Sequence, residues 1–327
     1  MIAPSSNLCT GTLLGVVALV TALLAPALAG EAPLLARVDG TLCAPALTGY
    51  PLGAALTCPG GGLIDWKAER RSGGRLILLD VPVPFGPEAT DLNVALLPPG
   101  SPHWLGTDAL GRDLLSRVIH GFPVALLVGG LAAILSLGLG LCVGSAAGMG
   151  GRWLDLGLSR VMDLMACFPT LILALALAAG AKRPGLGSLI IAIGVTRWTA
   201  IARFLRGELL RQRGLPYCDS ALAAGSGRLR LVLRHLLPNA LSPILVTAAF
   251  SVSHAMLLEA GMSFLGLGLP PGTASWGGIL SEAQRQVVPA WWLVLFPSLA
   301  LFLTVLSCNL LAEGVRESND PRLPRPV

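Results

Sequence analysis

Charged side chains are scarce in this chain. They make up 13% of its 327 residues, about half the share usual in soluble globular domains, whereas hydrophobic residues make up 54% and the mean hydropathy is +0.72. This balance argues against a soluble enzyme. It also excludes an intrinsically disordered chain, which requires low hydrophobicity and high net charge.

Motifs of catalytic and nucleotide-binding sites are missing as well. The sequence contains no Gly-x-x-x-x-Gly-Lys-Ser/Thr phosphate loop, no His-Glu-x-x-His zinc motif and no Gly-x-Ser-x-Gly nucleophile motif. No spacing of Cys and His is typical of a metal site, and we interpret His254 as a packed helix residue. We therefore expect a protein that is not an enzyme, holds no cofactor or metal and does not hydrolyse ATP itself.

The apolar residues are gathered in long blocks. A block of roughly 18 or more such residues can cross a hydrocarbon core of about 30 Å as a helix. We expect Pro169 to kink the third block, and Arg197 and Arg203 to extend from the fourth toward the membrane surface. The pattern predicts an all-α integral membrane protein with six transmembrane helices, over 8–28, 123–146, 161–181, 187–205, 239–258 and 290–311.

The first block, in residues 1–30, allows a second interpretation. Ala27-Leu28-Ala29 resembles the cleavage site of a secretory signal peptide. However, no basic residue precedes the block, and it exceeds the roughly 7–15 apolar residues expected in a signal peptide. We therefore predict a first transmembrane helix within 1–30, with a cleaved signal peptide as the alternative.

Charge is distributed unevenly between the loops. Residues 197–234 contain eight Arg against two acidic residues, a net charge of +6, whereas residues 31–120 contain seven Lys or Arg against nine acidic residues, a net charge of −2. Because basic loops are retained in the cytoplasm, the Arg-rich loop is predicted to be cytoplasmic and residues 31–105 to form an extracytoplasmic loop. Both termini, including the tail 316–327, are then cytoplasmic.

The extracytoplasmic loop is rich in Pro and Gly, and we expect only a few short strands and turns in it. It contains Cys43 and Cys58, and a disulfide is allowed in this compartment but not required. After the loop, Leu110 and Leu114 share one face of a helix while Arg112 and other polar residues fall elsewhere. This pattern predicts an interfacial amphipathic helix over 106–121.

A short helix is predicted in the cytoplasmic loop, over 217–224. Pro216 precedes it and Gly225 follows it, which is typical of helix boundaries. Its side chains are small, which lets a helix backbone approach another surface closely. A basic segment over 228–239 follows, in which apolar residues alternate with Arg. From the residues alone, docking on another protein and folding against the chain's own helices remain equally open.

Several motifs together resemble one family of transport proteins. Asp219-Ser220-Ala221, with Gly225 and Leu237-Pro238, resembles the EAA motif of ABC importer permeases, although Asp replaces the usual Glu and Ser replaces the first Ala. The stretches Leu105-Gly106-Thr107-Asp108, Gly111-Arg112-Asp113, Ser116-Arg117, Glu259-Ala260-Gly261-Met262-Ser263-Phe264-Leu265-Gly266, Ser275-Trp276-Gly277 and Trp291-Trp292 resemble C-type permeases of the dipeptide, oligopeptide and nickel importers. The resemblance covers about residues 100–323. The usual basic N-terminus is missing, and residues 31–100 form a longer loop than in common dipeptide permeases.

The resemblance implies the type I ABC importer permease fold, with a five-helix core over 122–315 that includes a coupling loop over 206–238. It implies a location in the bacterial inner membrane. The partners it implies are a second homologous permease of the B type, two cytoplasmic ABC ATPase subunits and an extracytoplasmic solute-binding protein, with no nucleic acid. The implied solutes are dipeptides or oligopeptides, or else nickel or a similar small solute. A secondary transporter or channel subunit independent of an ATPase is the alternative function.

The resemblance also implies roles for particular residues. The residues expected to couple to an ATPase are Tyr217, Asp219, Ser220, Ala221, Ala224, Gly225, His235, Leu237 and Pro238. The extracytoplasmic or interfacial family motif comprises Gly106, Thr107, Asp108, Gly111, Arg112, Asp113, Ser116 and Arg117. The candidate gate comprises Glu259, Ser263, Phe264, Leu265, Gly266, Trp276 and Gly277.

Overall fold

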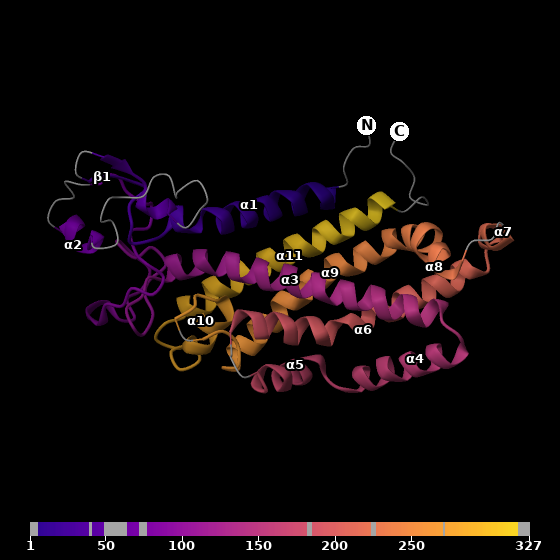
Figure 1. Ribbon diagram of the computed structural model, residues 1–327. Helices are drawn as coiled ribbons and strands as arrows, with labels where there is room; N and C mark the ends of the chain where they lie inside the picture. The colour runs from indigo at the N-terminus through magenta and orange to yellow at the C-terminus, as the bar shows by residue number, and fades with distance from the viewer. Residues whose placement is uncertain are drawn as a thin grey trace. The chain divides into compact units, whose positions relative to one another are not determined.

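The computed structural model describes residues 6–38, 41–48, 64–71, 77–181, 185–223, 227–270 and 272–319, and most of them are helical (Figure 1). Five helices of this part are long and apolar enough to cross a membrane, and a bent pair makes a sixth span if it is counted as one. Helices suit hydrocarbon because they satisfy their backbone N–H and C=O groups internally. The predicted all-α membrane fold is confirmed. The five helices are α1 (Ser6–Leu28), α3 (Leu114–Met149), α6 (Leu186–Arg213), α9 (Leu237–Phe264) and α11 (Trp292–Asn319).

The third predicted span is broken into two helices rather than kinked. α4 (Arg152–Cys167) and α5 (Thr170–Ala179) meet at a bend of 90°. Phe168, at the break, has φ −93° and ψ 133°, because the ring of the following Pro169 disfavours the helical conformation of the preceding residue. The prediction that Pro169 disturbs this span is confirmed, but a single helix over 161–181 is wrong.

Ion pairs join α4 to α6. The guanidinium of Arg206 donates to Asp155, with Nη2 2.8 Å from Oδ2. Nη2 of Arg203 lies 3.2 Å from Oδ1 of Asp163, which also pairs with Arg160 on its own helix at 3.6 Å. Arg203 was predicted to extend toward the membrane surface. The structure adds a partner, because α4 supplies a carboxylate within its reach.

The chain forms two compact units, and the first comprises residues 1–15, 127–269 and 303–327. Its central helix is α6, which packs against α4, α5 and α9. Among the candidate spans, α6 has the largest fraction of buried residues. The buried side of α6 includes Ile193, Ile201, Leu205 and Leu209. Gly140 of α3 lies directly against Ile201, and this close approach leaves no room for a side chain.

A series of short helical segments joins α6 to α9 within this unit. They are α7 (Pro216–Ala223), α8 (Arg228–Leu231) and the π-helical turn η5 (Val232–Leu236), and Figure 1 shows α7 beyond the end of α6. The predicted short helix over 217–224 is confirmed to within about one residue at each end, which is the usual uncertainty of helix boundaries. Cys218 of α7 is buried in the same apolar cluster as Leu205, Leu209 and Leu236.

The second unit comprises residues 16–126 and 270–302. It contains a three-stranded antiparallel sheet in the order β2-β1-β3, consistent with the few strands expected after residue 31. The small apolar core beside this sheet consists of Ala36, Val38, Cys43 and Trp66. Cys43 is disulfide-bonded, while Cys58, the cysteine with which a bond was left open, lies outside the described residues. The elements are β1 (Leu35–Val38), β2 (Thr41–Cys43), η1 (Pro45–Leu47), α2 (Trp66–Arg71), β3 (Ile77–Leu79), η4 (Leu92–Val94) and α10 (Trp276–Ala283).

The predicted interfacial helix over 106–121 is wrong in its first half. Residues 106–113 form a turn closed by a β-bridge between Thr107 and Asp113, and α3 begins only at Leu114. Gly106 and Gly111 have φ of +83° and +71°, values that interrupt a right-handed helix and that glycine adopts without strain. The helical spacing of the leucines was therefore a misleading pattern.

Replacing Gly140 by Leu is expected to destabilise the packing of α3 on α6. A Cβ atom there would lie 2.6 Å from Cβ of Ile201 and 3.1 Å from the carbonyl oxygen of Trp198. Overpacking of this kind costs about 1–3 kcal/mol. We expect a lower melting temperature for the detergent-solubilised protein, followed by tryptophan fluorescence. Gly138→Leu is the control, because nothing lies within 4 Å of a Cβ atom there. Equal melting temperatures for the two variants would contradict this packing.

Candidate functional site

A turn over residues 103–117 withdraws several charged side chains from water. Asp108 is at its centre: its side chain is 2% exposed, and Oδ2 accepts hydrogen bonds from Nε of Arg112 and Nη1 of Arg117, both at 2.7 Å. Its other oxygen, Oδ1, accepts from the backbone N–H groups of Leu110 at 2.8 Å and Arg112 at 3.0 Å. One carboxylate therefore fixes both the turn and two guanidinium groups.

Glu282 of α10 completes this charge network. Its Oε2 lies 2.6 Å from Nη2 of Arg112 and 2.6 Å from Nη1 of Arg117, and its Oε1 lies 3.1 Å from Nη2 of Arg117. Burial alone would lower the pKa of Arg112, but the carboxylates of Asp108 and Glu282 outweigh it and raise that pKa. Two anions balance two cations, which is the condition under which buried charges are tolerated.

The sequence indicated one half of the network. The motif residues Asp108, Arg112 and Arg117 are brought together as their shared motif suggests, but Glu282 was missed. It follows Arg117 by 165 positions, and its only distinction in the sequence is to be the first charge after Glu259. Among the described residues, no three His, Cys, Asp or Glu side chains are placed to hold a metal ion.

Two tryptophans hold this turn and the start of α3 in the second unit. Nε1 of Trp292 donates to the carbonyl oxygen of Thr107 at 3.1 Å, and Nε1 of Trp276 donates to the carbonyl oxygen of Val118 at 3.0 Å. Gly121 of α3 lies against the ring of Trp276 so closely that any side chain there would clash. Trp276 and Gly277, two of the candidate gate residues, are buried at the start of α10.

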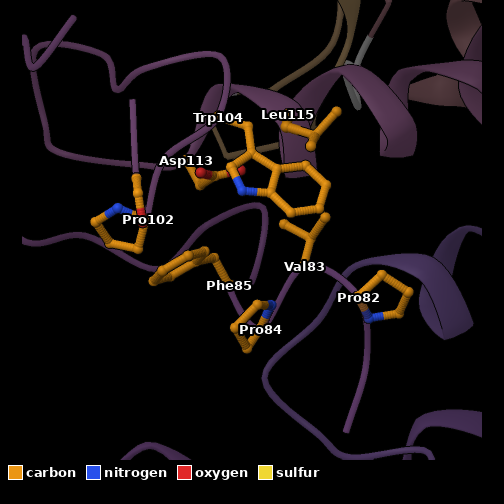
Figure 2. A pocket seen from close by; sticks show the side chains of 9 residues that line it. Pro82, Val83, Pro84, Phe85, Pro102, Trp104, Asp113 and Leu115 are labelled. Carbon is orange, nitrogen blue, oxygen red and sulfur yellow. The ribbon is translucent and has the colours of Figure 1, made fainter. Parts of the chain in front are cut away.

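His103 and Asp113 form a second buried pair in the turn. Nδ1 of His103 lies 2.9 Å from Oδ2 of Asp113, and Oδ1 of Asp113 accepts from the backbone N–H of Ser116 at 2.7 Å, which caps α3. Burial raises the pKa of the Asp113 carboxyl group. The pair lies beside a small cavity of about 170 Å³, whose wall Figure 2 shows to be built from Phe85, Trp104 and several prolines.

The remaining candidate gate residues lie at the end of α9 in the first unit. Glu259 is buried, and its Oε1 accepts a hydrogen bond from Oγ of Ser263 at 2.8 Å. Phe264 and Leu265 are exposed, and Gly266 has φ of +79°, which ends the helix. The arrangement presents two large apolar side chains next to a buried carboxylate.

The candidate coupling residues lie at and after the end of α6. Oη of Tyr217 donates to Oε1 of Gln212 at 2.8 Å, and Nε2 of Gln212 donates to Oε1 of Glu208 at 2.8 Å, so α7 is braced on α6. Ser220 is exposed on α7. Leu237 and Pro238 form the first turn of α9, where proline costs no backbone hydrogen bond. The side chains of Asp219, Ala221 and His235, and all of Ala224 and Gly225, lie outside the described part.

Comparison with known proteins gives concordant matches. The family described as binding-protein-dependent transport system inner membrane component matches residues 140–325. The chain is 44% identical over 237 residues to a putative peptide transport system permease protein of Brucella suis, covering 72% of this chain and 79% of that protein. It is 36% identical over 236 residues to a probable D,D-dipeptide transport system permease protein of Escherichia coli, again covering 72% and 79%.

Replacing Asp108 by Asn is expected to destabilise the protein strongly. The change leaves Arg112 and Arg117 with too little negative charge, and breaking a buried ion pair by removing one partner costs about 3–5 kcal/mol. Thermal unfolding in detergent would measure the loss. The control is Glu88→Gln, an exposed carboxylate of the same unit that forms no ion pair with a described residue, for which we expect little change. Asp108→Asn unfolding like the unaltered protein would show that the network contributes nothing.

Proposed function

This chain belongs to the family of binding-protein-dependent transport system inner membrane components, and we propose that the solute it carries is a peptide. It is a multi-pass permease component and not itself a catalytic subunit. The observation that carries the proposal is its 36–44% identity, over most of both chains, to permeases named for peptides or D,D-dipeptides. A free peptide is a small polar solute that cannot cross hydrocarbon without such a pathway.

The proposed importer contains further subunits. Because the sequence lacks a phosphate-binding loop, we assign ATP hydrolysis to two cytoplasmic ATPase subunits. A second homologous permease forms the other half of the channel, and a solute-binding protein delivers the peptide from outside. The Arg-rich segment 197–234 supports a topology with α7 and both termini in the cytoplasm.

We propose α7 as the coupling helix that contacts an ATPase. Three observations support this role: α7 is short, its described side chains are small around the exposed Ser220, and Tyr217 braces it on Gln212 of α6. A helix held in this way moves with α6 when the ATPases close. Ion pairs from Arg206 and Arg203 then carry α4 along, so that a rigid-body transition opens one side of the channel and closes the other.

We propose that the second unit faces outward, because the topology places residues 31–105 outside the membrane. The charge network of Asp108, Arg112, Arg117 and Glu282 holds a rigid surface there that suits contact with the binding protein. The exposed Phe264 and Leu265, at the end of α9, are proposed as part of an outer gate. Their bulk suits closure against a matching element of the second permease.

Replacing Ala221 by Arg is expected to abolish uptake without loss of membrane insertion. A long charged side chain on α7 holds the helix away from a close docking surface. The measurement combines peptide uptake with pull-down of the tagged, detergent-solubilised complex and mass spectrometry of its partners.

The control for this experiment is Ser220→Ala, which keeps a small residue on the same helix and removes only the Oγ bond to the carbonyl oxygen of Pro216. We expect it to retain the ATPase subunits and uptake. Normal uptake by Ala221→Arg would exclude α7 as the coupling helix. A wild-type chain that purifies without any ATPase would instead point to a secondary transporter.

A further inference from the structure

Arg197 is a charged residue without a partner in the apolar part of α6. Its Nε atom is buried and has no hydrogen-bond acceptor, and no described residue pairs with its guanidinium. Other arginines of the same helix differ in this respect. Arg203 and Arg206 pair with carboxylates of α4, and Arg213 donates to the carbonyl oxygen of Gly148. Arg197 is thus an arginine of α6 for which no described residue provides either a hydrogen-bond acceptor or a paired counter-charge.

The surroundings of Arg197 are apolar and closely packed. Two isoleucines on the same side of α6 are fully buried: Ile193, one turn before Arg197, and Ile201, one turn after it. The adjacent Thr196 and Trp198 are only 6% and 8% exposed. An unpaired charge in such a place is costly, and ionisable residues inside membrane spans almost always face a partner or a water-filled path. No described residue provides this partner, and an anion would compensate both the charge and the unsatisfied Nε–H of Arg197.

Lipid phosphate is a poor candidate for this anion. Arg197 follows Leu186, the first residue of α6, by eleven positions, which is about 16 Å along the helix axis. In a helix the Cα–Cβ bonds tilt toward the N-terminus, so that of Arg197 tilts away from the Arg-rich end of α6. At that end, Arg203 already occupies the position nearer the membrane surface and is paired there with Asp163. A buried Nε atom is also unlike a side chain extended into headgroups.

We infer that Arg197 binds the carboxylate of the transported solute during passage. This inference rests on the proposed function and deepens it, because every peptide with a free C-terminus carries a carboxylate. A guanidinium is a planar fork that binds a carboxylate through two parallel hydrogen bonds, which gives both charge compensation and orientation. The helix that provides it, α6, is the central helix of its unit and is joined directly to α7. The class of solute is thus a compact carboxylate.

The test compares two probes in the reconstituted importer. The complete complex in proteoliposomes, with its binding protein and ATP, is given radiolabelled alanyl-alanine or the same dipeptide with its C-terminus amidated. Arg197→Gln removes the charge, and we expect uptake of the free acid to fall about 10- to 100-fold, the range of a lost charge-assisted hydrogen bond. Uptake of the amide should change much less. Arg197→Lys keeps the charge without the fork and should recover part of the uptake of the free acid.

The control on the same helix is Arg203→Gln, which removes an equal charge that pairs with Asp163 at 3.2 Å. It should affect both probes alike. Equal losses for acid and amide in Arg197→Gln would overturn the inference. So would loss of the second permease from purified Arg197→Gln complexes and its return with Arg197→Lys, because the counter-charge would then belong to that subunit. Absence of peptide uptake by the wild-type complex would overturn the peptide function together with this inference, whereas wild-type uptake that Arg197→Gln leaves unchanged would overturn the inference alone.

Discussion

Hydrocarbon cannot hydrate a charge, and this constraint organises the charged residues of the chain. In the second unit, Asp108 and Glu282 neutralise two buried arginines and thereby hold the turn before α3 against α10. In the first unit, carboxylates of α4 neutralise arginines of α6, and a broken span becomes part of the bundle as a result. Only 13% of the residues are charged, and several of these charges form ion pairs that join one helix to another element.

In the proposed importer, these ion pairs bear directly on transport. A permease that is driven from outside itself must convert the displacement of one short element into movement of whole helices. The contact of Tyr217 with Gln212 and the ion pairs of α6 with α4 make a continuous mechanical connection from α7 into the helices of the first unit. Close helix approach at Gly140 adds stiffness, because packed interiors deform little and instead change between discrete arrangements. Arg197 stands apart from this scheme, since no described residue of the chain accepts a hydrogen bond from its buried Nε atom.

The sequence predicted elements well wherever one local pattern dominates. Long apolar blocks predicted α1, α3, α6, α9 and α11, and proline and glycine with small residues predicted α7. It failed where two local patterns compete. The leucines near residue 110 favour a helix, but Gly106 and Gly111 adopt left-handed backbone conformations and Asp108 bonds backbone amides, and the turn prevails. The break at Phe168 was underestimated for a similar reason, because one proline disturbs two residues rather than one.

The sequence by itself therefore determined the environment, the helical class and the family motifs, because hydropathy, periodicity and short motifs are properties of neighbouring residues. Only the tertiary structure decided which charges meet. Glu282 joins Arg117 across 165 positions, Arg206 joins Asp155 across 51, and Nε1 of Trp276 donates to the carbonyl oxygen of Val118 on α3. Such pairings depend on how helices distant in the chain pack, and packing depends on shape and distance, which no local pattern of residues encodes.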